Sequence, residues 1–153
     1  MSKILPLVFY PDHRLRERSL DIDPNNIAAL LGLASDMSKT MIADKGIGLA
    51  APQVGKNIRL IIVSTKSGPQ VMFNPKIVGK SLLQEWGEEG CLSIPGVFGN
   101  VKRYRTVECS FLDTEGKKQS AQAEGLLARI IQHEIDHLDG VLFIDRAEDI
   151  RQE

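Results

Sequence analysis

The segment His-Glu-Ile-Asp-His at positions 133–137 constrains the fold of this chain more than any other feature. It lies within an amphipathic pattern that predicts a helix from about residue 123 to residue 138, with apolar positions at Leu126, Leu127, Ile130, Ile131, Ile135 and Leu138. Because residues four apart share one face of a helix, His133 and His137 can both direct imidazole nitrogens at one metal ion, while Glu134 reaches its edge. The chain is therefore expected to fold around a helix that carries a metal site.

A third ligand for this site is not found directly downstream. The extended metalloprotease signature H-E-x-x-H-x-x-G-x-x-H would place a histidine at position 143, where the sequence has Phe143. The acidic residues beyond the helix are expected to be exposed charges of the tail; they are Asp145, Glu148 and Asp149. Cys91, in the segment Glu-Glu-Gly-Cys-Leu-Ser at positions 88–93, is the better candidate, because two histidines and one thiolate leave a fourth position open for water. A buried, inert cysteine is the alternative.

A third motif, Gly-Ile-Gly-Leu-Ala-Ala-Pro-Gln-Val-Gly, occupies positions 46–55. Its small residues allow the backbone to come close to a ligand, and Gln53 offers a side-chain amide donor. The motif lacks the Gly-Lys-Ser/Thr ending of a phosphate loop and does not lead from a strand into a helix, so a nucleotide site is disfavoured. From the residue types alone, an ordinary turn after a helix is equally open.

The remaining pattern predicts an α+β fold, in which mostly antiparallel β-sheets pack around the C-terminal helix that carries the two histidines. An N-terminal helix is expected after Asp23, with Pro24 at its first position and Gly46 as its stop. Runs of β-branched residues predict strands at positions 59–64, 71–73, 76–78 and 107–112. Cys109, within the last run, is expected to be a small buried residue.

Composition and charge exclude several classes of protein. Nineteen basic and 20 acidic residues leave a net charge of -1, so no global field attracts nucleic acid or an anionic membrane. The first apolar run is broken by Pro6 and Pro11 and is too short for a secretory signal or a membrane span. Two cysteines without such a signal favour a reducing, cytoplasmic location. No repeat or linker divides the chain, so a single catalytic domain over residues 1–153 is expected.

Together the three motifs resemble those of the peptide deformylase family, whose pattern is G-x-G-L-A-A-x-Q, then E-G-C-L-S, then H-E-x-x-H. All three are present here without a mismatch. The resemblance extends over nearly the whole chain, since Tyr-Pro-Asp-His-Arg-Leu-Arg near the start and positions 125–143 near the end are also similar to family sequence.

The resemblance implies a reaction and a role for each motif. The implied metal ligands are Cys91, His133 and His137. Glu134 is implied as general acid and base, with the side chain of Gln53 and the backbone N–H of Leu92 as donors to the oxyanion. The implied reaction removes the formyl group from the N-terminal formylmethionine of nascent polypeptides and releases formate, with a metal-bound water as the nucleophile.

The substrate pocket and the cofactor follow from the same resemblance. Leu126 and Ile130 lie on the stripe of the two histidines and are expected to form an apolar slot for the methionine side chain, although ordinary core packing is the alternative. The resemblance adds Gly46, Ile47 and Gly48 to this pocket. The implied cofactor is one divalent ion, typically Fe²⁺, for which Zn²⁺, Ni²⁺ or Co²⁺ can substitute. The resemblance also allows a transient contact with the ribosome, but the short C-terminal segment counts against it.

Three other interpretations have distinct signatures. A zinc metalloprotease would cleave internal peptide bonds without releasing formate. A structural metal module would need a fourth protein ligand, and the one remaining histidine, His13, is expected in an exposed turn. An inactive relative would usually lack a metal ligand or Glu134, and neither is lost here.

Overall fold

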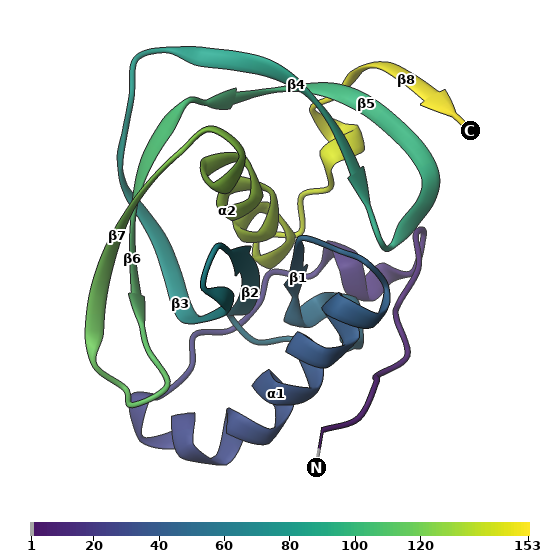
Figure 1. Cartoon of the computed structure of the whole chain (residues 1–153). Coiled ribbons are helices and arrows are strands. Elements are labelled where there is room, and N and C mark those ends of the chain that lie inside the picture. Colours follow the sequence, from purple (N-terminus) through teal and green to yellow (C-terminus); the bar gives the residue numbers. More distant parts are fainter. Residues whose placement is uncertain (1) are drawn as a thin grey trace.

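The computed structural model describes residues 2–153 and contains two antiparallel sheets arranged around a helix (Figure 1). The five-stranded sheet has the order β1-β2-β3-β6-β7, with β1 at Gly48–Ala50, β2 at Leu60–Thr65, β3 at Gly68–Lys80, β6 at Thr106–Leu112 and β7 at Lys118–Glu124. The three-stranded sheet has the order β4-β5-β8, with β4 at Gln84–Cys91, β5 at Ile94–Tyr104 and β8 at Glu148–Gln152. The helices are α1 at Ile27–Ala43 and α2 at Gly125–Leu138. This architecture confirms the predicted α+β class.

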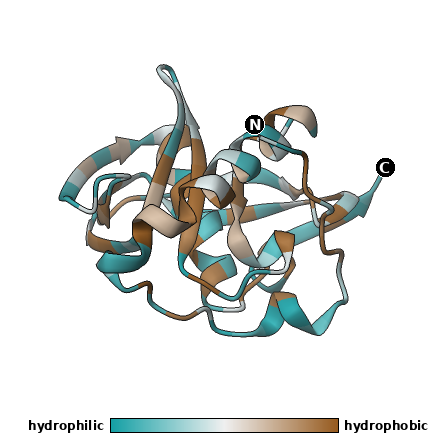
Figure 2. Ribbon diagram, turned by 90° about the horizontal axis from the view of Figure 1, so that it is seen from below, coloured by the Kyte–Doolittle hydropathy of each residue, from teal (hydrophilic) through white to brown (hydrophobic). Residues whose placement is uncertain are grey.

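Helix α2 is held in place by apolar contacts with the five-stranded sheet. The cluster that buries it comprises Ala128, Ile130, Ile131 and Leu138 of α2 together with Ile61, Val63, Met72, Val107 and Cys109 of the strands. Figure 2 shows the apolar segments running through the strands at the centre of the view, whereas the outer turns are mostly hydrophilic. Burial of the isoleucine, leucine, valine and methionine side chains of this cluster contributes about 1.5–3 kcal/mol each. Cys109 is fully buried in β6, as its pattern predicted.

The start of α2 differs from the prediction. The expected helix begins at about residue 123, but β7 continues to Glu124 and Ala123 pairs with Val107 of β6. Gly125 adopts a φ of +63°, which a residue with a side chain rarely adopts, and the chain turns there directly from strand to helix. A local sequence pattern does not reveal this strand, because β7 is held by its pairing with β6 and the local propensity of its residues does not report that contact.

The end of α1 also differs by one residue. Lys45, not Gly46, takes the left-handed conformation with a φ of 58°, and the Gly46 N–H donates to the carbonyl oxygen of Met41 at 2.9 Å. Gly46 also packs closely against Leu92: a Cβ there would lie 2.6 Å from Cδ1 of Leu92, so the Leu92 side chain would have to shift. The small residue therefore brings the end of α1 against the turn that follows Cys91.

The strands show three further differences from the sequence pattern. Positions 71–73 and 76–78 belong to one strand, β3, which has a register shift at Asn74. Asn74 has a φ of 50°, and its side-chain amide bonds both the N–H and the carbonyl of Ile22 at 2.8 Å. The β4–β5 hairpin was not predicted as strands, and the acidic tail beyond residue 147 forms β8, paired with β5.

No helix within residues 2–153 combines the length and the apolar character needed to cross a membrane.

Candidate metal centre

Helix α2 presents both histidines of the 133–137 segment to one side. His133 and His137 are buried, and their ring centroids lie 5.1 Å apart in an edge-to-face arrangement. Phe143, at the position where a longer signature would supply a ligand, instead stacks on the His133 ring at a centroid distance of 6.1 Å. It therefore forms part of the apolar wall behind the histidines.

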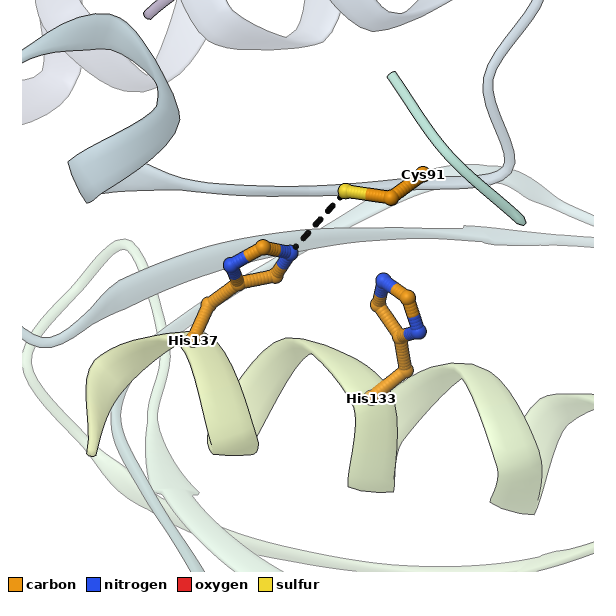
Figure 3. A group of neighbouring side chains, drawn as sticks. All are labelled: Cys91, His133 and His137. Carbon is orange, nitrogen blue, oxygen red and sulfur yellow. Dashed lines mark hydrogen bonds between the residues drawn. The ribbon is translucent and has the colours of Figure 1, made fainter. Parts of the chain in front are cut away.

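Cys91 completes this group of side chains from the three-stranded sheet. It is the last residue of β4, and the turn at Leu92 and Ser93 leads into β5. Its Sγ lies 3.3 Å from Nε2 of His137 (Figure 3), and the ligand atoms of Cys91, His133 and His137 all lie within 4.8 Å of one another. Bond lengths of 2.3 Å to sulfur and 2.0–2.1 Å to nitrogen in a tetrahedral site place those two atoms about 3.6 Å apart. The three side chains thus fit one shared ion.

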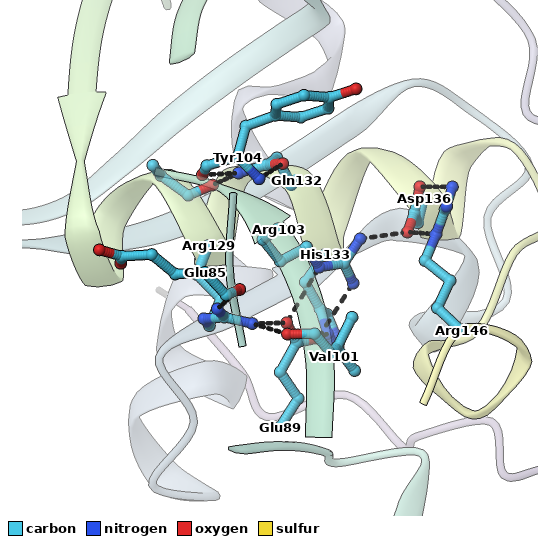
Figure 4. Close-up of polar contacts among 11 residues, drawn as sticks. Glu85, Glu89, Val101, Arg103, Tyr104, Arg129, Gln132, His133, Asp136 and Arg146 are labelled. Carbon is cyan, nitrogen blue, oxygen red and sulfur yellow. Dashed lines mark hydrogen bonds and ion pairs between the residues drawn. The ribbon is translucent and has the colours of Figure 1, made fainter. Parts of the chain in front are cut away.

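The carboxylate of Glu89 orients His133. Its Oε1 lies 2.8 Å from Nδ1 of His133, which leaves Nε2 of that ring for the metal (Figure 4). Arg103 binds both oxygens of Glu89 at 2.9 and 3.0 Å, and Arg129 binds Oε2 at 2.8 Å. Burial alone would raise the pKa of Glu89, but the hydrogen bonds from His133 and Arg103 outweigh it and hold the pKa well below its usual range. Glu89 therefore stays a carboxylate.

The role of Glu89 was missed at the level of sequence, although a signal existed. Glu89 lies two residues before Cys91 on the same strand, and alternate residues of a strand point to the same face. That alternation predicts that Glu89 and Cys91 face the same side, and both do contact histidines of α2, although a register shift interrupts the β4–β5 pairing between Gly90 and Cys91. The hydrogen bonds around Glu89 extend to α2, where the Asp136 carboxylate accepts from Arg103 at 2.6 Å and from Arg146 at 2.8 Å.

Gln53 is fixed beside the thiolate. It lies in the 3₁₀ helix Ala51–Val54 that follows β1, and it is almost completely buried. Its Oε1 accepts a hydrogen bond from the Ala50 N–H at 2.9 Å. Its Nε2 donates to Oγ of Ser93 at 3.1 Å and lies 3.5 Å from Sγ of Cys91. These contacts define which end of the Gln53 amide is the oxygen and which is the nitrogen. The nitrogen end faces Cys91.

Glu134 is a buried carboxyl group next to the three ligands. Burial raises the pKa of Glu134 to about 7. Its Oε1 has no hydrogen-bond partner in the part of the chain that the structure describes, and neither has the buried Nδ1 of His137. Buried polar atoms are rarely left unpaired in folded proteins, so the unpaired Oε1 of Glu134 is suited to bind a polar group of a ligand.

A cavity of about 480 Å³ opens beside this centre. Its lining includes every residue predicted for the substrate pocket: Gly46, Ile47, Gly48, Leu126 and Ile130. Cys91, Leu92, His133, Glu134 and Gln53 also reach it. Ile130 is buried, whereas Leu126 and Ile47 are largely exposed and lie at the mouth.

Other predicted positions lie away from the centre. His13 is exposed in the short helix His13–Arg16. Asp145 pairs with Arg16, and Glu148 and Asp149 are exposed. None of them belongs to the Cys91, His133 and His137 group.

Comparisons with known proteins agree with this geometry. The family model described as polypeptide deformylase matches residues 4–153. A peptide deformylase of Prochlorococcus marinus is 45% identical over 146 residues, which are 90% of this chain and 72% of that protein. One of Rhizobium meliloti is 47% identical over 147 residues, covering 93% and 84%.

Solved structures give the same result. A peptide deformylase from Synechococcus elongatus in complex with actinonin superposes with a TM-score of 0.89 at 45% identity, covering 95% of this chain and 79% of the other. A class I type b peptide deformylase from Acinetobacter baumannii, bound to Met-Ala-Ser, superposes with a TM-score of 0.90 at 36% identity, covering 95% and 99%.

Proposed function

Because this chain belongs to the peptide deformylase family and removes the formyl group from N-terminal formylmethionine, we propose that Glu134 is the acid and base of its reaction. The observation that carries the proposal is the position of the Glu134 carboxyl group. It is buried, it reaches the cavity beside Cys91 and His133, and its Oε1 is unpaired among residues 2–153. A buried carboxyl group within reach of the reacting atoms is suited to proton transfer.

Each residue of the centre then has a defined task. A divalent ion bound by Cys91, His133 and His137 would act as a Lewis acid and would lower the pKa of water. Glu134 accepts a proton from the attacking water and delivers it to the amine that leaves. Formate and a free amino terminus are the products.

Negative charge develops on the formyl oxygen during the attack. We assign its stabilisation to Nε2 of Gln53 and to the backbone N–H of Leu92. The support is the fixed orientation of Gln53: its Oε1 accepts from the Ala50 N–H, and its Nε2 donates one N–H to Oγ of Ser93 and directs the other toward Sγ of Cys91. A donor that needs no reorganisation is worth roughly 2.7–4 kcal/mol to the transition state.

The cavity is proposed to hold the methionine side chain. Ile130 supplies a buried apolar wall, and Leu126 and Ile47 cover the mouth. Gly46 and Gly48 bring backbone to the same cavity without filling it. The solved relative that binds Met-Ala-Ser holds a peptide with the required methionine end.

Gly48→Ala is expected to lower kcat sharply while the protein stays folded. A Cβ at Gly48 would collide with Oε2 of Glu134 and lie 2.9 Å from Cγ2 of Ile130. The carboxyl group would have to move, and misplacement of a reacting group by about 1 Å can cost about 100-fold in rate. The check is steady-state kinetics with a formyl-Met-Ala peptide, with Gly32→Ala as the control because a Cβ at Gly32 meets nothing within 4 Å. Unchanged kcat in Gly48→Ala would contradict the position assigned to Glu134.

We propose Fe²⁺ as the physiological ion. Imidazole and thiolate ligands suit several divalent metals, so the support is the family resemblance together with the donor set. Protein reconstituted with Fe²⁺ is expected to lose activity in air, while protein reconstituted with Ni²⁺ keeps it, because ferrous iron and its thiolate ligand oxidise. Metal analysis of protein purified without oxygen tests the proposal. Zinc as the dominant ion, with an air-stable activity, would contradict it.

A cytoplasmic location is proposed, since nascent formylated peptides are made there. Docking on the ribosome is not part of the proposal.

A further inference from the structure

A second cavity lies on a different face of α2 from the one that carries the metal ligands. It has a volume of about 260 Å³, and α2 contributes Gln132 and Ile135 to its wall. Strands β3, β4 and β5 supply most of the remaining lining. This cavity shares no lining residue with the cavity beside the metal centre, so it is available to a different ligand.

The lining of this second cavity is strongly basic. It contains four cationic side chains and one carboxylate, Asp136; the cations are Lys80, Lys102, Arg103 and Arg146. The chain as a whole carries a net charge of -1, so this concentration of positive charge is local. Cations gathered around a concave site raise the local concentration of anions.

The two arginines of the cavity are already balanced by carboxylates. Arg103 is almost completely buried and donates to Glu89 and to Asp136. Arg146 binds both oxygens of Asp136, at 2.8 and 3.1 Å (Figure 4). Two arginines and two carboxylates neutralise one another, so the positive charge that remains in the cavity comes from the lysines.

Lys80 and Lys102 have no such balance. Among residues 2–153 the only lysine in an ion pair is Lys117, so neither of them has a carboxylate partner. The ammonium group of Lys80 lies 4.7 Å from the centre of the Tyr104 ring, which holds it at the cavity. Lys102 lies two residues before Tyr104 on β5, and alternate residues of a strand point to the same face. The two ammonium groups therefore belong to one wall of the cavity.

The lining also has an apolar part. Ile77 of β3 and Ile135 of α2 reach the cavity, and both are half-buried. The volume of the cavity corresponds to roughly nine water molecules at ~30 Å³ each, which is more than an inorganic phosphate ion needs. A ligand that fills the cavity therefore carries an organic group beside its anionic group.

We propose that this cavity binds a small organic phosphate monoester. Lys80 and Lys102 bind the phosphate group, and the organic group lies against Ile77 and Ile135. A phosphate monoester carries a charge of about -1.5 to -2 at neutral pH, which matches two lysines without partners. A nucleic acid is less suited, because the net charge of the chain provides no field for a polyanion beyond the cavity.

Equilibrium dialysis with the metal-loaded protein tests the proposal, with inorganic phosphate and phenyl phosphate as probes. Phenyl phosphate is expected to bind about 10-fold more tightly, because its ring buries apolar surface against the isoleucines. The double variant Lys80→Gln/Lys102→Gln is expected to bind phenyl phosphate about 10-fold or more weakly, the loss typical of hydrogen bonds to a charged group. Both lysines are exposed, so the variant is expected to fold and to release formate at the wild-type rate.

Lys45→Gln is the matched control. Lys45 is also an exposed lysine, but it lines the cavity beside the metal centre. The affinity of this variant for phenyl phosphate is expected to equal that of the wild type. The wild type is also measured with an excess of Met-Ala-Ser, and its affinity is again expected to stay the same, because the two cavities share no residue.

Different results would overturn different parts of the inference. An unchanged affinity in Lys80→Gln/Lys102→Gln would show that the second cavity does not bind the phosphate group. A loss of affinity in Lys45→Gln, or in the wild type with Met-Ala-Ser, would show binding at the metal centre instead. Phenyl phosphate that binds no more tightly than inorganic phosphate would exclude an organic monoester, and a short single-stranded RNA that binds more tightly than phenyl phosphate would favour a polyanion.

Discussion

Cys91→Ala is expected to lose its bound metal and its deformylase activity together. The variant keeps the two histidines of α2 but removes the one ligand that comes from the β4–β5 hairpin. Loss of a residue that merely orients a ligand typically costs 10–100-fold in metal affinity or activity, so loss of the ligand itself should cost more than about 100-fold. The measurement is metal per chain after gel filtration without oxygen, combined with formate release.

Cys109→Ala provides the matched control for this result. Cys109 is the other cysteine of the chain, fully buried in β6, and it is not part of the metal group. The control should keep its full metal content and lose only a modest amount of stability, because a small cavity replaces the thiol. A Cys91→Ala protein that still binds one ion per chain and turns over would show that the thiolate is not a ligand.

Glu134→Gln is expected to keep the metal and lose most of the rate. Glutamine fills the same space as the buried carboxyl group but cannot carry the proton. Removal of a general acid or base typically lowers the rate by about 10²–10⁴-fold. The check is kcat measured at equal metal content. Glu124→Gln, at the exposed N-cap of α2, is the control for the same chemical change. Turnover at the wild-type rate would show that Glu134 does not transfer the proton. Loss of metal would show that Glu134 helps to bind the ion instead.

The metal ligands were found in the sequence because their chemistry is concentrated in short segments. His133 and His137 are separated by one helical turn, and Phe143 excludes a downstream third ligand. Cys91 was then identified from its neighbours and from the family pattern. The structure brings all three together, although β4 and α2 are distant in the sequence.

The hairpin that carries Cys91 could not be predicted as strands. Its first strand reads Gln-Glu-Trp-Gly-Glu-Glu-Gly-Cys, with no alternation of apolar residues, and most of its side chains are exposed. Strand β4 is stabilised by its pairing with β5 and by Glu89, which is buried through its ion pairs with Arg103 and Arg129. These are tertiary contacts between distant segments, so local propensity does not report them.

The same reason explains why Arg129 was not anticipated. On a helical wheel it belongs to the polar part of α2, where arginine is usually exposed. Only the approach of Gly87 and Glu89 from β4 buries that position.

Deformylation is tested most directly by a product analysis of the wild type with formyl-Met-Ala-Ser. The protein is purified without oxygen, its metal is quantified, and formate and all peptide fragments are measured over one time course. One formate is expected for each new free amino terminus, with Met-Ala-Ser left intact. Cleavage of an internal peptide bond without release of formate would contradict it.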